Sequence, residues 1–215
     1  MIKIAPSILA ADLLNLEEEI KLIDKLGAEY IHIDVMDGHY VPNISFGPEI
    51  VKKLKKITKK KLDVHLMIKP VLPYINKFIE YGADIISFHP EADDKSNQII
   101  EILSKSNCKP AIAIHPNVKF EEIIHFLPKV NLVVVMTVVP GFGGQAFLDS
   151  ELRKIKDLYK FRKDNKLNFE IEVDGGINKE TAEKCKNHGA DVLVAGTYIF
   201  SQNENKYKNL IDSLR

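Results

Sequence analysis

Two hydrophobic periods alternate along this chain. Short apolar runs such as 30–36 and 131–137 contain many β-branched residues, which is typical of buried strands. Between these runs, apolar residues recur three and four positions apart, as they do on one face of a helix. The pattern predicts eight strand-then-helix units without a break in composition. Strict alternation favours parallel strands, because parallel neighbours need a helical crossover connection.

The predicted elements can be placed by their start and stop residues. Three helices end at a glycine that precedes an alanine, an acidic residue and a strand, at Gly27, Gly82 and Gly189. The expected strands cover residues 2–9, 30–36, 61–67, 84–88, 110–114, 131–137, 169–174 and 192–195. The expected helices begin after an N-cap at Asp12 and near residues 47, 73, 96, 120, 152, 181 and 206.

Eight such units in 215 residues fit an α/β fold, a (β/α)8 TIM barrel with a single domain over residues 1–215. An open doubly wound sheet is the alternative. It would more naturally show a GxGxxG turn after its first strand, and residues 7–10 read Ser-Ile-Leu-Ala instead. In a barrel, the active site lies at the C-terminal strand ends and in the loops after them.

Composition narrows the class of protein. Apolar residues make up 45% of the chain and charged residues 28%, and the formal net charge is zero, so neither nucleic acid nor a membrane is an expected partner. Cys108 and Cys185 have no CxxC neighbour, which favours a reducing compartment over a disulfide framework. We see no secretory leader, and the longest apolar run, near 132–140, is too short to span a bilayer. We therefore expect a cytoplasmic protein.

One strand has an unusual inner face. In the stretch 31–43, His32, Asp34 and Met36 share one side of the strand, while the branched apolar residues between them share the other. A single buried His is more often a core residue with satisfied hydrogen bonds. A face that carries both His and Asp fits a barrel interior if it meets a metal ion or a reacting substrate.

Two other strands supply matching groups. His65 lies near the end of the next strand, and Asp174 is the last residue of the seventh strand, across the pore. These side chains and the pair His32 and Asp34 can converge at the top of a barrel, which favours a metal site over four separate core residues. The donor set suits one divalent cation per subunit, and ligand type alone does not choose among Zn2+, Fe2+, Co2+ and Mn2+.

Three glycine-rich loops follow neighbouring strands in the last third of the chain. They contain, in order, Gly141-Phe142-Gly143-Gly144, Gly175-Gly176 and Gly196-Thr197. Glycines let backbone N–H groups approach an anion, and barrel enzymes often bind phosphate with the loops after the last two strands. The pattern favours a phosphate-binding cup, and a mobile lid without a ligand is the alternative.

Together these groups indicate a reaction class. A cation at the strand ends can hold a carbonyl oxygen and a neighbouring hydroxyl and stabilise an enediolate. Carboxylates on opposite walls, Asp34 and Asp174, can remove a proton from one face of the adjacent carbon and deliver one to the other face. The sequence therefore predicts epimerisation next to the ketone of a phosphorylated sugar.

Seven motifs, spread almost from end to end, match one enzyme family. They are residues 4–10 (IAPSILA), 32–38 (HIDVMDG), 41–43 (VPN) with 46–47 (FG), 63–67 (DVHLM), 136–138 (MTV) with 140–145 (PGFGGQ), 173–177 (VDGGI) and 194–196 (VAG). On these motifs the chain resembles the ribulose-phosphate 3-epimerase family. The resemblance implies a TIM barrel that interconverts D-ribulose 5-phosphate and D-xylulose 5-phosphate in the pentose phosphate pathway, as a homo-oligomer (dimer or hexamer).

The resemblance also implies residue roles. The implied metal ligands are His32, Asp34, His65 and Asp174, with Asp34 as proton acceptor and Asp174 as proton donor, and these two roles exchange in the reverse direction. The implied substrate contacts are Ser7, His65, Gly141, Phe142, Gly143, Gly144, Asp174, Gly175, Gly176, Gly196 and Thr197. Met36, Met67 and Met136 would line the space over the intermediate, where the residues alone predict only core packing.

A few positions depart from the family pattern. Thr197 stands where serine is usual, and we expect phosphate binding to survive because the hydroxyl and backbone N–H are kept. Tyr198 replaces a commonly small residue and could crowd that loop. His115 is either an extra polar group near the cup or a substitution without catalytic meaning. His89 belongs to a family-like segment, and we assign it no chemistry.

Two other functions use the same residues. An allulose-6-phosphate 3-epimerase, acting on a hexulose phosphate, would keep the same carboxylates and metal, and pocket volume would separate it from a pentulose enzyme. A non-catalytic barrel that binds sugar phosphates would have lost a proton-transfer residue. Both Asp34 and Asp174 are present, which argues against such a binding protein.

Overall fold

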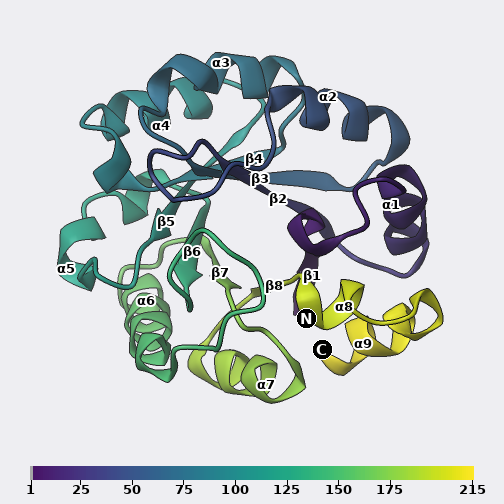
Figure 1. Cartoon of the computed structure of the whole chain (residues 1–215). Helices are drawn as coiled ribbons and strands as arrows, with labels where there is room; N and C mark the ends of the chain where they lie inside the picture. Colours follow the sequence, from purple (N-terminus) through teal and green to yellow (C-terminus); the bar gives the residue numbers. More distant parts are fainter. Residues whose placement is uncertain (1) are drawn as a thin grey trace.

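Eight parallel strands form one sheet that curves into a nearly closed barrel (Figure 1). The computed structural model describes residues 2–215. The strands are β1 (Lys3–Pro6), β2 (Tyr30–Met36), β3 (Lys61–Met67), β4 (Ile85–Phe88), β5 (Lys109–Ile114), β6 (Leu132–Met136), β7 (Glu170–Asp174) and β8 (Val192–Ala195). They pair in the order β1-β8-β7-β6-β5-β4-β3-β2, and a single parallel bridge between Ser7 and His32 joins the two ends.

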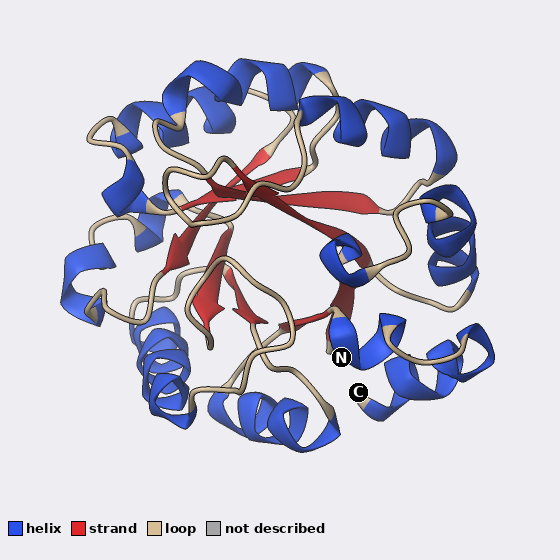
Figure 2. Cartoon of the chain, in the orientation of Figure 1, coloured by secondary structure: helices blue, strands red, loops and turns tan. Residues whose placement is uncertain are grey.

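Helices surround the strands on the outside of the barrel, as Figure 2 shows. The α-helices are α1 (Leu16–Lys25), α2 (Pro48–Ile57), α3 (Leu72–Glu80), α4 (Ser96–Ser104), α5 (Phe120–Ile123), α6 (Leu152–Asp164), α7 (Lys179–His188), α8 (Thr197–Phe200) and α9 (Tyr207–Ser213). Short 3-10 turns are η1 (Ile8–Ala10), η2 (Pro90–Ala92), η3 (Leu127–Lys129), η4 (Asp149–Glu151) and η5 (Glu204–Lys206). Within residues 2–215, no helix has the length and apolar character needed to cross a membrane. The order and direction of the strands confirm the predicted TIM barrel.

The start of the first helix differs from its prediction. The helix begins at Leu16, whereas the sequence places it directly after Asp12. The Asp12 carboxylate accepts hydrogen bonds from the backbone N–H of Leu14 at 3.0 Å and from the side chain of Asn15 at 2.8 Å. Those bonds form a turn before the helix. An Asp side chain supports a turn and a helix N-cap with the same acceptor, so the pattern alone did not separate the two.

The two faces of β2 have different surroundings. Ile31, Ile33 and Val35 are buried in the main apolar cluster between the sheet and the helices. Burying each of these side chains stabilises the fold by about 1.5–3 kcal/mol. His32 and Asp34 alternate with them and are equally buried, so they face the barrel interior. The polar inner face predicted for this strand is therefore present.

Strand pairing places the polar side chains at matching heights. In the register of β2 with β3, Asp34 is opposite His65 and Met36 is opposite Met67. In the register of β6 with β7, Met136 is opposite Asp174. Because parallel strands of a barrel end at the same side, these residues gather at one mouth.

Candidate active site and metal centre

Side chains from three strands meet at the C-terminal end of the barrel. His32 and Asp34 come from β2, His65 from β3 and Asp174 from β7. Nε2 of His32 lies 3.4 Å from Oδ1 of Asp34 and 3.8 Å from Oδ2 of Asp174. Nδ1 of His65 lies 3.5 Å and 3.6 Å from the same two oxygens. The structure thus brings together all four residues that the sequence predicts to converge, and we refer to them as the four-residue cluster.

The four-residue cluster fits a divalent cation. Nε2 of His32 and Nδ1 of His65 are buried, and neither has a hydrogen-bond partner within residues 2–215. Leaving such an atom unpaired costs about 1–3 kcal/mol, and a cation between the four side chains would satisfy both nitrogens. A tetrahedral zinc site with bonds of about 2.1 Å would separate its donors by about 3.4 Å. The nitrogen-to-oxygen distances in the cluster, 3.4 to 3.8 Å, are close to that spacing.

A buried carboxylate holds the ring of His32. Nδ1–H of His32 donates to Oδ2 of Asp63 at 2.7 Å, and both side chains are fully buried. Because this proton stays on Nδ1, a bound cation could take the place of the proton on Nε2, which faces the four-residue cluster. Glu172 lies beside this pair, with Oε1 3.6 Å from Nδ1 of His32. Burial, and then the nearby charge of Asp63, raise the pKa of Glu172 well above its usual value, which favours a neutral carboxyl group there.

Asp34 is ionised in spite of its burial. Burial raises its pKa, but in the metal-free protein the attraction of the protonated His32 ring, and then the closeness of His65, outweigh that effect, so the net shift of the pKa is downward. Oγ of Ser7 donates to Oδ2 of Asp34 at 2.6 Å, which fixes the plane of the carboxylate. The side chain of Asp34 is 6% exposed and that of Asp174 is 14% exposed, so Asp174 is the more accessible of the two.

A second imidazole backs His65. Nε2 of His65 lies 3.0 Å from Nε2 of His89, which directly follows β4. Burial lowers the pKa of His89 to about 4, so this ring is neutral at pH 7. The sequence interpretation gave His89 no chemistry. The available signal was its position, because His89 follows the C-terminal end of β4, the strand next to the one that contains His65.

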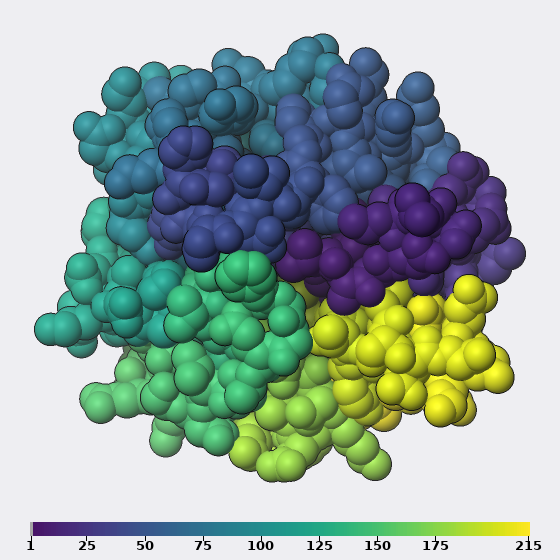
Figure 3. Space-filling model, in the orientation of Figure 1, coloured from purple at the N-terminus to yellow at the C-terminus, as the bar shows by residue number. Residues whose placement is uncertain are grey.

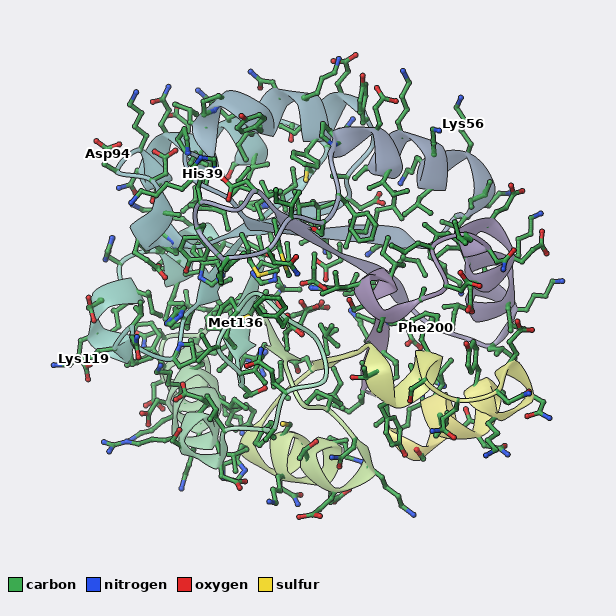
Figure 4. All side chains as sticks on the ribbon, in the orientation of Figure 1. His39, Lys56, Asp94, Lys119, Met136 and Phe200 are labelled. Atoms are coloured by element: carbon green, nitrogen blue, oxygen red, sulfur yellow. The ribbon has the colours of Figure 1, made fainter. Side chains whose placement is uncertain are left out.

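A cavity opens above the four-residue cluster. Asp34 and Asp174 lie in its wall, whereas His32 and His65 are fully buried behind it. The other predicted site residues that line the cavity are Ser7, Met36, Met67, Met136, Gly141, Phe142, Gly143, Gly144, Gly175, Gly176, Gly196 and Thr197. Figure 4 labels Met136, which lies within the ring of strands. Leu9, Ala10, Val138, Pro140, Gln145, Ile177 and Val194 also line the cavity without having been predicted, because uncharged side chains give no chemical signal in a sequence.

Glycine backbone forms one side of the cavity. Gly176 has a φ of +65°, and a Cβ at this position would lie 2.7 Å from the backbone nitrogen of Phe147. Only glycine fits there without a shift of the chain. At Gly143, by contrast, a Cβ would meet nothing within 4 Å. These residues bring backbone, rather than side chains, to the cavity surface, where N–H groups can bind an anion.

Hydrogen bonds anchor the loop after β6. The side-chain amide of Asn43 donates to the carbonyl of Gly141 at 2.8 Å. The amide of Gln145 donates to the carbonyls of Val139 at 2.7 Å and Phe142 at 2.8 Å. Figure 3 shows the segments near residues 40 and 140 side by side on the face that carries the strand ends. These bonds argue against a freely mobile lid.

The positions that depart from the family pattern lie in different places. Thr197 lines the cavity. The hydroxyl of Tyr198 is 3.0 Å from Oγ of Ser213, so this ring points toward α9 and does not crowd the cavity. His115 lines a separate depression together with Tyr40 and Glu91. His115 is therefore not a member of the glycine-lined cavity.

Comparisons with known proteins agree with this geometry. The profile described as "Ribulose-phosphate 3 epimerase family" matches residues 3–200. The chain is 46% identical to a ribulose-phosphate 3-epimerase of Bacillus subtilis, covering 96% of this chain and 95% of that protein. Proteins of the same name are 44% identical in Methanocaldococcus jannaschii, covering 98% and 90%, and 37% identical in Escherichia coli, covering 99% and 94%.

Solved structures of other proteins share the fold. A mutant tryptophan synthase alpha-subunit from Pyrococcus furiosus aligns with a TM-score of 0.72 at 12% identity, over 100% of this chain and 98% of that chain. Thiamine phosphate pyrophosphorylase from the same organism aligns with a TM-score of 0.67 at 17% identity, over 100% and 94%. At such identities the likeness concerns the fold alone. The matched profile and the nearly full-length relatives show that the chain belongs to the ribulose-phosphate 3-epimerase family and is an enzyme of that kind.

Proposed function

We propose that this enzyme interconverts D-ribulose 5-phosphate and D-xylulose 5-phosphate by exchanging a proton at C3, with Asp34 and Asp174 as the two proton-transfer groups. The observation that carries the proposal is the position of these carboxylates. They come from β2 and β7, approach the same two imidazoles and both line the cavity. A carbon held between two carboxylates can lose a proton to one and receive a proton from the other, which inverts its configuration.

The four-residue cluster is proposed to hold one divalent cation, from the set Zn2+, Fe2+, Co2+ and Mn2+. Two buried imidazole nitrogens without a hydrogen-bond partner among residues 2–215 support this assignment. When bound, the cation supplies a Lewis acid that polarises the ketone next to C3. Such polarisation would make the C3 proton acidic enough for the Asp34 carboxylate to accept it.

Asp34 and Asp174 are assigned different roles in each direction. Asp34 accepts the proton from one epimer while Asp174 donates a proton to the opposite face, and the roles exchange in the reverse reaction. The hydrogen bond from Ser7 to Oδ2 restricts rotation of the Asp34 carboxylate, so its orientation toward the substrate is fixed before binding. Ser7 also lines the cavity, which supports a substrate contact.

The rest of the cavity is proposed to bind the remainder of the substrate. Met36, Met67 and Met136 are almost fully buried in its wall and supply an apolar cover that keeps water from the intermediate. The glycine-rich segments 141–144 and 175–176, with Gly196 and Thr197, are proposed to bind the phosphate through backbone N–H groups. Binding energy from the remote phosphate can then orient C3 between the carboxylates.

Turnover of D-ribulose 5-phosphate and of allulose 6-phosphate by the purified enzyme tests this proposal. We expect the pentulose phosphate to be the better substrate. We also expect activity to disappear when metal analysis shows that chelation is complete, and to return with a divalent cation. Activity confined to the hexulose phosphate would show the substrate assignment to be wrong. Full activity of a metal-free enzyme would show that the cation is not needed for catalysis.

A further inference from the structure

A line of polar side chains runs from the four-residue cluster toward the protein surface. It starts at His65, continues through His89 and Glu91, and ends at Tyr40. Nε2 of His65 is 3.0 Å from Nε2 of His89, and Nδ1 of His89 is 3.4 Å from Oε1 of Glu91. The hydroxyl of Tyr40 donates to the same carboxylate oxygen at 2.8 Å. We call these four residues the outer line.

The short contact between the two imidazoles limits where their protons can be. Two ring nitrogens at 3.0 Å need one proton between them, because two protons would repel and two lone pairs would leave no hydrogen bond. The proton therefore belongs either to Nε2 of His65 or to Nε2 of His89. Both rings are fully buried, so water does not offer an alternative partner.

Glu91 separates these two possibilities. Nδ1 of His89 is buried without a hydrogen bond inside the described chain, and its charged neighbour is the Glu91 carboxylate. A carboxylate attracts an N–H and repels a lone pair, so it favours the proton on Nδ1 of His89. A neutral His89 with its proton on Nδ1 has a bare Nε2. The shared proton must then come from Nε2 of His65.

Other neighbours of His89 do not oppose this assignment. The ring of Tyr40 packs on His89 with centroids 4.7 Å apart, and its hydroxyl is directed to Glu91. The ring of His115 is 6.4 Å away, and its Nδ1 accepts a hydrogen bond from the backbone N–H of Asn117 at 3.1 Å. His115 is thus engaged with its own loop.

We propose that His89 and Glu91 are positioning residues that keep the proton of His65 on Nε2 and so leave Nδ1 available to a divalent cation. The inference rests on the proposed role of His65 as a metal ligand. His32 and His65 would then be oriented in two ways, His32 directly by the carboxylate of Asp63 and His65 by a carboxylate acting through a second imidazole. Glu91 is 36% exposed, so the second arrangement connects the metal centre to a surface depression.

Nitrogen-15 NMR of the histidine rings in the wild-type protein tests the central step. We expect His89 to be the neutral form with its proton on Nδ1, both in metal-free protein and after addition of Zn2+. Observation of His89 with its proton on Nε2 would overturn the inference. The measurement needs no variant and no substrate, so it does not depend on turnover.

Zn2+ titrations of variants test the consequence for binding. We expect His89→Phe, which has no acceptor for Nε2–H of His65, to weaken Zn2+ binding about 10- to 100-fold. His89→Gln keeps an acceptor oxygen and should recover most of that loss. Glu91→Gln removes the charge at constant size and should give a mixture of His89 tautomers with an intermediate loss. Glu101→Gln, an exposed acid on α4, is the matched control and should bind Zn2+ like the wild type.

The outcomes separate this inference from the proposed function. Wild-type Zn2+ affinity in both His89→Phe and Glu91→Gln would overturn the positioning role inferred for His89 and Glu91. The proposed proton transfer by Asp34 and Asp174 would not be affected. Failure of the wild-type enzyme to epimerise D-ribulose 5-phosphate would refute the proposed function while the His89 tautomer stays as expected. If His89→Phe does not fold, the Glu91→Gln titration and the wild-type NMR spectrum still decide the question.

Discussion

The four-residue cluster and the glycine loops (residues 138–148, 175–178 and 196–197) lie on two sides of one cavity, yet they offer different chemical groups. The cluster consists of charged or titratable side chains that are buried or nearly so, and two of them have short hydrogen bonds, His32 with Asp63 and Asp34 with Ser7. The loops offer backbone, and Val139 and Phe142 in them are each 55% exposed. Side chains held this firmly suit proton transfer, and accessible backbone suits binding of a phosphate. We therefore expect changes in the cluster to affect kcat and changes in the loops to affect KM.

Asp34→Asn should have the largest effect. The amide has nearly the shape of the carboxylate but cannot accept the C3 proton, so we expect kcat to fall about 10²- to 10⁴-fold. Steady-state kinetics on D-ribulose 5-phosphate measure this change, with the metal content of each preparation determined in parallel. A rise in KM with little change in kcat would contradict the proposed division of roles between the cluster and the loops.

Asp63→Asn tests the support behind the cluster. The carboxylate of Asp63 accepts the proton of His32 Nδ1 without touching the cavity. Removing its charge should weaken Zn2+ binding about 10- to 100-fold, with little change in KM once the enzyme is saturated with metal. Isothermal titration with Zn2+ provides the measurement. An unchanged affinity for Zn2+ together with a raised KM would be the opposite of the expected result.

Gly176→Ala tests the loop side. A Cβ would lie 2.7 Å from the nitrogen of Phe147, and φ is +65°, so the backbone must shift from its present position. Losing one hydrogen bond to a charged phosphate costs about 1.5–3 kcal/mol, so KM should rise about tenfold or more. Gly143→Ala is the matched control, since its Cβ meets nothing within 4 Å. Equal KM values for the two variants would mean that the loop backbone does not bind phosphate at Gly176.

Thr197→Ser should have the smallest effect. Both residues keep a hydroxyl and the backbone N–H at the cavity wall. A change within about 0.5 kcal/mol, or about twofold in KM, is expected for such a substitution. Steady-state assays of the wild type and the variant in parallel measure the change in KM. A tenfold difference in KM would contradict this expectation and would assign a role to the threonine methyl group.

The sequence was most informative where its period was strong. The strands over residues 30–36 and 61–67 have the predicted limits, because inward polar residues alternate there with apolar ones. The convergence of the four-residue cluster also followed from the sequence, since barrel topology brings the C-terminal ends of strands together. Asp12 misled the placement of α1, because its side chain supports a turn as readily as a helix start.

The surroundings of the cluster could not be predicted in the same way. The contact between His65 and His89 depends on ring orientation across two strands, and a sequence contains no distances of that kind. The pairing of His32 with Asp63 follows from the register of β2 with β3, which the alternation pattern does not state. Resemblance to a family identified the residues with chemistry. Their partners became visible only with side-chain positions.

Transfer of solvent deuterium by Asp174→Asn tests the central claim most directly. In D2O, the wild-type enzyme should place deuterium at C3 of the epimerised product, because the donated proton comes from a carboxyl group that exchanges with solvent. The amide side chain of the variant has no acidic proton to deliver, so we expect deuterated product to form about 10²- to 10⁴-fold more slowly. Formation of deuterated product at the wild-type rate, in a variant shown to retain its metal, would contradict proton transfer by two carboxylates.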